Sequence, residues 1–221
     1  MTGREQESLD SRWQAYQQLE RLREHWYWRP GWRQGRSFYT WHLTFDGQAA
    51  LFDLARRLQA GLDLPGLEPV PMEGLHLTMQ GVGFADEVSR EDLAAIVAAA
   101  RVRCGALRPF RLTLGPVDPD AEAVALLVCP WAPVEQVRMA IRDAIGSVWG
   151  DVPESQGDFR PHVTVAYSGA NVPVDGIRQR MRALRDLAPV SVDIGEVQLI
   201  ALNRDERVYR WDVVGSVPLG R

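Results

Sequence analysis

Two stretches of this chain carry the same order of predicted secondary structure. Over residues 37–119 the apolar residues recur at strand and helical spacings that predict strand, helix, strand, helix and strand, and residues 120–219 repeat this order. No low-complexity tract or long Gly/Ser linker separates the two stretches. We therefore expect an α+β fold in which two pseudo-symmetric lobes, with mainly antiparallel sheets, belong to one domain and enclose a central cleft.

The elements of both stretches follow from apolar periodicity and from capping residues. In the first stretch, strands are expected at residues 37–45, 75–80 and 110–114, with helices after Asp46 and after Ser89. In the second stretch, strands are expected at residues 124–129, 161–167, 190–202 and 208–217, with helices after Pro133 and over residues 175–187. Side chains alternate across a strand, so the parity of each position predicts which residues face the cleft.

Length and charge narrow the class of protein. The chain has 221 residues, of which 46% are hydrophobic, enough for one substantial core. The 29 acidic residues outnumber the 25 basic ones, so the net charge is −4 and a coat on duplex DNA is not expected. All basic residues are arginine, which excludes a lysine nucleophile or Schiff base.

The cysteines and the amino terminus bear on the compartment. Cys104 and Cys129 are too few for a disulfide framework, and no Cys/His spacing typical of structural zinc is present. The first residues are polar, and the longest apolar runs, 93–100 and 123–129, are far too short to cross a bilayer. We expect a cytoplasmic protein that is neither secreted nor membrane-spanning.

Residues 1–36 form an extension with its own composition. It holds seven arginines and five acids, a net charge of +2. Helical spacing of apolar residues predicts a helix, and a loop dense in aromatic residues and arginines follows, in which the candidate ligand contacts are Trp26, Tyr27, Trp28 and Trp32. Flat rings beside arginine can stack on nucleobases, but the same rings can instead pack the extension onto the domain.

Each stretch places the same tripeptide at the same step of its order. His76-Leu77-Thr78 lies in the first stretch and His162-Val163-Thr164 in the second, each within an apolar strand. In each tripeptide, the histidine and threonine are two residues apart and therefore share one face of their strand. If an approximate two-fold relates the lobes, two imidazoles and two hydroxyls meet at one point of the cleft.

Such a meeting point suits phosphoryl chemistry. Imidazole titrates near pH ~6.5, so one ring can act as a base while the other acts as an acid. Hydrolysis of a cyclic phosphodiester needs both, because the attacking water loses a proton and the departing ribose oxygen gains one. The threonine hydroxyls would donate hydrogen bonds to the non-bridging oxygens. No metal or cofactor is required.

Three further polar residues share the predicted cleft face by parity. His42 is either a substrate contact or a satisfied groove residue, Gln80 can bind a ribose or base or be solvated, and Arg160 can fork onto phosphate or stay on the surface. The three histidines do not have familiar metal-ligand spacing, and no acidic partner is placed beside them, so no metal site is expected.

The paired H-x-T motifs resemble those of the 2H phosphoesterase superfamily. The resemblance rests on residues 74–84, residues 160–168 and the closing segment 209–219, and within the superfamily it is nearest the 2'-5' RNA ligase and cyclic phosphodiesterase branch. It implies a bilobal fold over residues 37–219 and metal-independent action on 2',3'-cyclic phosphate or 2',5'-linked substrates. It also implies a catalytic set of His76, Thr78, His162 and Thr164.

Two departures from the family pattern keep alternatives open. The first departure is the aromatic extension. The second is Tyr167, which stands where many ligase-type relatives place a basic residue. Strand parity places Tyr167 on the face opposite His162. We predict a cyclic phosphodiesterase acting on a 2',3'-cyclic nucleotide or RNA end. The alternatives are a nucleotide-binding or sensing module without turnover, and a 2'-5' RNA ligase.

Overall fold

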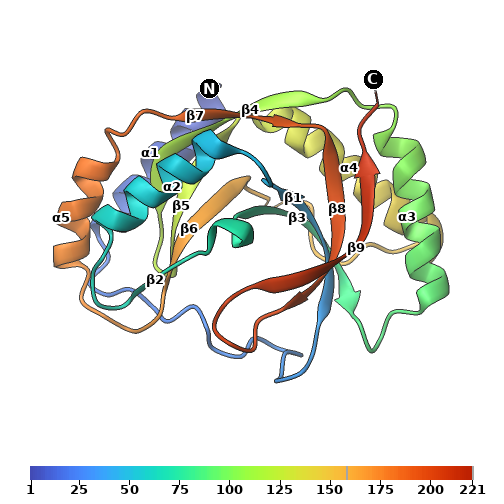
Figure 1. Cartoon of the computed structure of the whole chain (residues 1–221), viewed down its shortest axis with the longest axis horizontal. Helices are drawn as coiled ribbons and strands as arrows, with labels where there is room; N and C mark the ends of the chain where they lie inside the picture. Colours follow the sequence, from blue (N-terminus) through green and yellow to red (C-terminus); the bar gives the residue numbers. More distant parts are fainter. Residues whose placement is uncertain (158, 221) are drawn as a thin grey trace.

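The computed structural model describes residues 1–157 and 159–220, and these form two antiparallel sheets with helices on their outer sides (Figure 1). The four-stranded sheet has the order β3 (His76–Phe84), β1 (Phe38–Thr44), β8 (Glu196–Asn203) and β9 (Arg210–Pro218). The five-stranded sheet has the order β2 (Leu67–Pro69), β6 (His162–Ser168), β5 (Ala123–Cys129), β4 (Phe110–Pro119) and β7 (Val190–Ile194). The predicted α+β class with antiparallel sheets is confirmed.

The helices divide between the two sheets. In sequence order they are α1 (Gly3–Gln17), α2 (Ala49–Gly61), α3 (Arg90–Cys104), α4 (Trp131–Trp149) and α5 (Asp175–Leu184), and a 3-10 turn, η1 (Met72–Gly74), precedes β3. Helices α3 and α4 pack on the four-stranded sheet, and α1 and α2 pack on the five-stranded sheet with α5 beside α2 (Figure 1). The buried faces of these elements form the hydrophobic core.

The two halves of the chain exchange strands. β4 ends the first half but pairs with β5 of the second, and β8 comes from the second half but pairs with β1 of the first. The sheets therefore do not follow the contiguous division at residues 119 and 120 that the repeat predicted. Apolar periodicity identifies strands, but it carries no information about which strands pair, so the exchange could not be read from it.

One predicted strand is in fact two. The continuous apolar pattern over residues 190–202 predicted a single strand, but the chain leaves the five-stranded sheet after Ile194 and enters the four-stranded sheet at Glu196. Gly195 stands at the crossing, where its carbonyl accepts the Leu219 N–H at 2.8 Å. β7 buries alternate side chains and β8 buries the consecutive residues 197–200, so apolar residues continue across the break and do not mark it.

The extension packs against the rest of the chain. Helix α1 buries Leu9 and Tyr16. It ends at Gln17, which is earlier than the helical spacing of the apolar residues in the sequence predicts. Residues 18–37, which we call the strap, then cross from the side of the five-stranded sheet to the start of β1 (Figure 1). Leu22 and Trp26 of the strap are buried in the core, whereas Tyr27 and Trp28 are exposed.

No helix within the described part of the chain is long and apolar enough to span a membrane. Cys104 and Cys129 are both free and buried.

Candidate active site

The two H-x-T motifs meet in one cavity between the sheets. β3 of the four-stranded sheet carries the first motif, and β6 of the five-stranded sheet carries the second. His76, Thr78, His162 and Thr164 all line this cavity, which has a volume of about 420 Å³ and which we call the histidine cavity. The predicted convergence of two imidazoles and two hydroxyls is therefore present in the structure.

A β-bulge follows each motif at the same place. In β3, His42 of β1 faces Thr78 and Trp41 faces Gln80, so Met79 is the extra residue. In β6, Ala125 faces Thr164 and Val124 faces Ala166, so Val165 is the extra residue. Because a bulge adds one residue to one strand, the alternation of side chains reverses beyond it.

This reversal changes two predictions that were made from parity. Gln80 turns away from the histidine cavity, is fully buried, and donates through Nε2 to the Pro153 carbonyl at 2.7 Å. Its Oε1 accepts a hydrogen bond from Arg142 at 2.7 Å, so both ends of the amide are used. Tyr167, expected on the face opposite His162, instead lines the histidine cavity.

Both motif histidines have the same tautomer. Nδ1 of His76 lies 2.8 Å from the Gly74 carbonyl, and Nδ1 of His162 lies 2.9 Å from the Arg160 carbonyl. A carbonyl oxygen only accepts, so each Nδ1 carries the hydrogen and donates it. In the neutral ring, Nε2 then holds the free lone pair, and the bond at Nδ1 fixes the orientation of the ring.

Burial disfavours the protonated form of both motif imidazoles. Loss of solvation lowers the pKa of His76 from its ordinary value, against a smaller opposing effect of the Gly74 carbonyl. Burial, followed by the nearby Arg160 charge, lowers the pKa of His162 to about 4. A bound phosphate would oppose both shifts, because a negative charge favours the imidazolium.

His42 lies against the first motif. Its ring stacks on His76 with centroids 4.4 Å apart and planes 5° apart, and its Nε2 lies 3.3 Å from Thr78 Oγ1. His42 is fully buried, lines the histidine cavity, and has no hydrogen-bond partner at Nδ1 among the described residues. Its position orients the Thr78 hydroxyl, which neither of the two sequence interpretations had specified.

The two sides of the histidine cavity differ. The position of His42 is taken by Ala125 in the second motif's sheet, and the position of Tyr167 is taken by Gly81 in the first. A Cβ at Gly81 would come within 2.5 Å of a carboxylate oxygen of Glu154, which fills that space. One side therefore presents stacked imidazoles and the other a phenol ring.

Arg160 does not line the histidine cavity. Its guanidinium pairs with Asp118, a carboxylate with no solvent exposure, and Arg12 contacts the same carboxylate at 3.1 Å. A buried carboxylate needs such partners, because an unpaired charge inside a protein is costly. Parity predicted that Arg160 shares the face of His162, but it could not predict that a buried acid on β4 would hold the guanidinium.

Replacing Arg160 by alanine should therefore lower the stability of the folded protein and have only a small effect on the reaction rate. Removing Arg160 leaves the buried Asp118 carboxylate with Arg12 as its remaining ion-pair partner, so we expect the free energy of unfolding to fall by about 2 kcal/mol. Urea unfolding measures this change. Arg111→Ala is the matched control, because its pair with Asp193 is 67% and 70% exposed and should contribute less than about 1 kcal/mol. Unchanged stability with a large loss of activity would show instead that Arg160 binds the substrate.

Three of the aromatic residues in the wall of the histidine cavity, His25, Tyr167 and Tyr209, contact one another. The ring of His25, from the strap, stacks on Tyr167 at 4.0 Å, and its Nε2 lies 2.9 Å from the Tyr209 hydroxyl. Tyr209 in turn sets its ring at 90° to His76, 5.8 Å away. Burial lowers the pKa of His25 to about 3, so this imidazole is neutral. Periodicity and parity did not identify His25, and its only signal was its place in the aromatic run.

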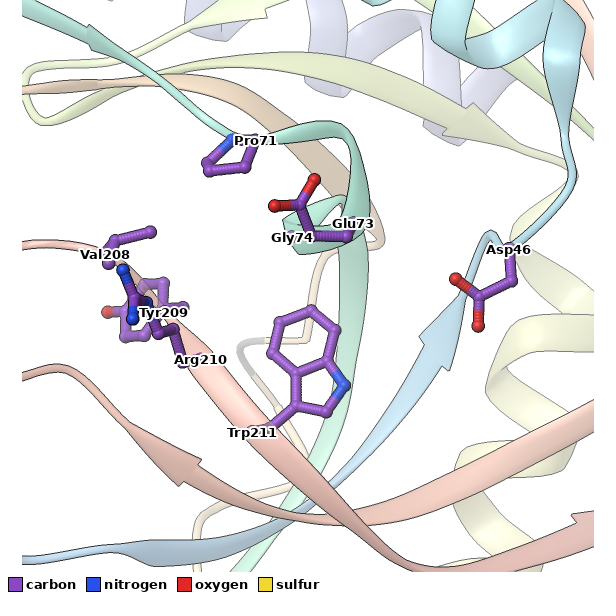
Figure 2. Close-up of a pocket in the computed structure, with 8 residues that line it drawn as sticks. All are labelled: Asp46, Pro71, Glu73, Gly74, Val208, Tyr209, Arg210 and Trp211. Carbon is purple, nitrogen blue, oxygen red and sulfur yellow. The ribbon is translucent and has the colours of Figure 1, made fainter.

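A second cavity of about 540 Å³, drawn in Figure 2, shares the lining residue Tyr209 with the histidine cavity. Trp211 stands between the two, with its ring edge-on to His42 and His76 at 5.8 and 5.4 Å. In Figure 2 the same ring lies between Tyr209 on one side and the Asp46 carboxylate on the other. The second cavity contains no histidine among its described lining residues, so the acid–base groups belong to the histidine cavity.

Among the described residues, no three His, Cys, Asp or Glu side chains are grouped so that they could hold a metal ion.

Comparison with solved structures places this fold among known ones. E. coli LigT complexed with 3'-AMP is similar with a TM-score of 0.64 and 20% identity, over 84% of this chain and 99% of that one. TT0787 of Thermus thermophilus gives 0.62 and 20% over the same shares. ATU0111 of Agrobacterium tumefaciens gives 0.54 and 13%, over 81% of this chain and 85% of that one. These likenesses confirm the bilobal fold.

The family comparison agrees with the fold. Residues 45–206 match the model of the 2'-5' RNA ligase superfamily, a span that includes both H-x-T motifs and leaves the strap outside. A comparison with curated proteins gives no match. Since the matched span covers well over half of the chain, this protein belongs to the 2'-5' RNA ligase superfamily.

Proposed function

We propose that this protein is a phosphodiesterase that hydrolyses a cyclic phosphate, either a 2',3'-cyclic nucleotide or an RNA end, or a 2',5'-phosphodiester, by histidine acid–base catalysis. The observation that carries the proposal is the matched pair of imidazoles, His76 and His162. Each is fixed through Nδ1 by a backbone carbonyl and lines the same cavity. Two such groups provide the base and the acid that hydrolysis requires.

In the proposed reaction, a water molecule attacks phosphorus while the neutral Nε2 of one motif histidine removes its proton. The bond from phosphorus to one ribose oxygen breaks, and the protonated Nε2 of the other histidine donates a proton to that oxygen. The product is a phosphomonoester with one free ribose hydroxyl. The acidic histidine gains its proton when the bound phosphate raises its pKa against the effect of burial.

The threonines supply the electrostatic part. Thr78 and Thr164 lie two residues after the motif histidines, and both line the histidine cavity. Their hydroxyls would donate to the non-bridging oxygens, where negative charge increases during the attack. In this reaction His42 Nε2 donates to Thr78 Oγ1, which leaves the single hydrogen of the Thr78 hydroxyl for the phosphate.

A nucleotide as substrate is supported by a structural relative. E. coli LigT was crystallised with 3'-AMP, with ATP and with NADP+. These ligands are nucleotides with phosphate groups, the chemical class that the histidine cavity would take.

The test is a product assay with purified protein. Nucleoside 2',3'-cyclic phosphates, an RNA with a cyclic phosphate end and 2',5'-dinucleotides are each incubated with the protein, with and without EDTA. We expect phosphomonoester product from at least one of them and the same rate in EDTA, since the proposed step uses only side chains. A 2',5'-linked product from RNA halves would instead identify a ligase.

The pH dependence of kcat/KM should be bell-shaped with its maximum below pH ~6.5. The reaction needs one motif histidine unprotonated and the other protonated in the free enzyme. Because burial lowers both pKa values, that of His162 to about 4, both limbs of the profile move to the acid side. The maximum of kcat should lie at higher pH, because substrate phosphate raises the pKa of the acid. Initial rates across pH measure both, and a kcat/KM maximum above pH ~8 would contradict the assignment.

One observation favours a second candidate, a nucleotide-binding module without turnover. Burial lowers the pKa of both motif histidines, which disfavours the protonated form that the acid needs until phosphate binds. If bound phosphate fails to raise either pKa far enough, the ligand is held and not cleaved. Binding of a cyclic nucleotide without any product would support this candidate over the hydrolase.

A further inference from the structure

The second cavity presents a flat ring close to the catalytic histidines. Trp211 of β9 is half-buried, and its ring centroid lies 5.4 Å from that of His76. Its ring contacts among the described residues are with His42 and His76 only, both nearly perpendicular, and its indole Nε1 has no hydrogen-bond partner there. Figure 2 shows this ring almost face-on. A flat ligand group can therefore stack on Trp211 inside the second cavity.

The free polar groups of the second cavity are hydrogen-bond acceptors. Asp46 and Glu73 line it, both are exposed, and neither has a hydrogen bond or ion pair with any described residue. The single basic residue among its described lining, Arg210, pairs with Glu206 at 2.9 Å. Because a carboxylate only accepts hydrogen bonds, the cavity favours a ligand group that carries N–H donors. A phosphodiester carries no such donor, so it does not fit here.

Glu73 belongs to the turn that orients a motif histidine. It lies in η1, where the Gly74 N–H donates to the Pro71 carbonyl at 2.9 Å. The Gly74 carbonyl in turn accepts the hydrogen of His76 Nδ1 at 2.8 Å. In Figure 2 the Glu73 carboxylate lies between Pro71 and the Trp211 ring. A ligand group bound to this carboxylate is therefore held beside both the flat ring and His76.

We propose that the second cavity is a nucleobase subsite, in which the base stacks on Trp211 and Glu73 selects guanine. This inference rests on the proposed function and names the base of its substrate. In a nucleoside 2',3'-cyclic phosphate, the ribose alone separates the base from the phosphate. Tyr209 lines both cavities, so a ribose beside it would join the phosphate in the histidine cavity to the base in the second cavity.

The choice of guanine follows from its hydrogen-bond donors. Guanine carries two adjacent donors, N1–H and the 2-amino group, and one carboxylate can accept a hydrogen bond from each. On the corresponding edge, adenine and cytosine carry one amino group and uracil carries one ring N–H. The second hydrogen bond to a charged acceptor should therefore strengthen the binding of guanine about tenfold over that of the other bases.

The experiment compares nucleosides that share the reacting end and differ in the base. The 2',3'-cyclic phosphates of guanosine, inosine, adenosine and uridine are titrated into the His162→Ala protein, in which turnover is blocked and the described lining of the second cavity is unchanged. We expect the guanosine compound to bind about tenfold more tightly than the adenosine and uridine compounds. Inosine keeps N1–H but lacks the 2-amino group, so its compound should also bind about tenfold more weakly than the guanosine compound.

Variants made in the same protein separate the two parts of the subsite. Glu73→Gln should remove the preference for guanosine and change binding of the uridine compound less than about twofold, whereas Trp211→Ala should weaken all four compounds about tenfold. Asp212→Asn and Trp28→Ala are the matched controls. Asp212 is an exposed carboxylate with no partner among the described residues, Trp28 is an exposed ring, and neither lines either cavity. Thermal unfolding checks that the variants remain folded.

The outcomes separate the subsite from the proposed function. Equal binding of all four compounds, binding of none, or loss of the guanosine preference in Asp46→Asn but not in Glu73→Gln would overturn the proposal. If Trp211→Ala does not fold, the order of the four compounds in the protein with an intact second cavity still decides. Hydrolysis is measured separately with the unsubstituted protein. Equal hydrolysis of all four compounds would leave the hydrolase standing without the subsite, and guanosine-selective binding without product would do the reverse.

Discussion

Replacing His76 or His162 by alanine should lower kcat/KM for the cyclic phosphate by about 10²–10⁴-fold. Each imidazole is proposed to transfer one proton in the same step. In a variant that lacks either ring, water must accept or donate that proton instead. The double variant should be little worse than the more damaged single variant, because groups that act as a unit are not additive. Steady-state rates with one cyclic nucleotide measure all three proteins.

Controls for these variants address folding and geometry. Both rings line a cavity instead of filling the core, so melting temperatures should change little. Asparagine at either position offers a side-chain N–H to the carbonyl that Nδ1 now contacts but has no titrating nitrogen, so it should be as inactive as alanine. Full activity in the double alanine variant would overturn the hydrolase assignment.

Replacing Thr78 or Thr164 by valine should lower kcat by about 10²–10³-fold with a smaller change in KM. Valine keeps the shape of threonine but has no hydroxyl, so it removes only the hydrogen bond to the phosphate oxygen. The loss falls mainly on kcat if that bond strengthens as charge develops, because such a bond stabilises the transition state more than the bound substrate.

Thr44→Val is the matched control for both threonine variants. Thr44 belongs to the third H-x-T tripeptide, His42-Leu43-Thr44, but does not line the histidine cavity. Its replacement should leave kcat unchanged. A rise in KM with constant kcat in the Thr78 or Thr164 variants would show that the hydroxyls only bind the substrate and do not assist the reaction.

The sequence predicted the centre of the site better than its surroundings. Within each tripeptide, parity alone placed His and Thr on one face, because no bulge interrupts those three residues. The rule failed one residue later, at the bulged residues Met79 and Val165. As a result, Gln80 faces away from the histidine cavity and Tyr167 faces into it, each contrary to the prediction. Nothing in the residue types at these positions distinguishes a bulge from a regular strand.

Residues brought in from distant parts of the chain were the hardest to predict. His25 reaches the histidine cavity from a loop without secondary structure, and it contacts Tyr167 and Tyr209, which are far from it in sequence. Arg160 was drawn to Asp118, an acid on another strand. Such contacts depend on the tertiary arrangement, which periodicity and parity do not describe.

The exchange of strands between the halves has a consequence for motion and for folding. β4, from the first half, lies in the interior of the five-stranded sheet, and β8, from the second half, lies in the interior of the four-stranded sheet. Neither half can therefore complete its own sheet. A hinge motion between two bodies requires that few chain segments cross from one body to the other. Here the exchanged strands join the two sheets, so they oppose a hinge motion between them. The gap between the two imidazoles is accordingly set when the protein folds, so separately produced halves should remain unstructured until they are mixed.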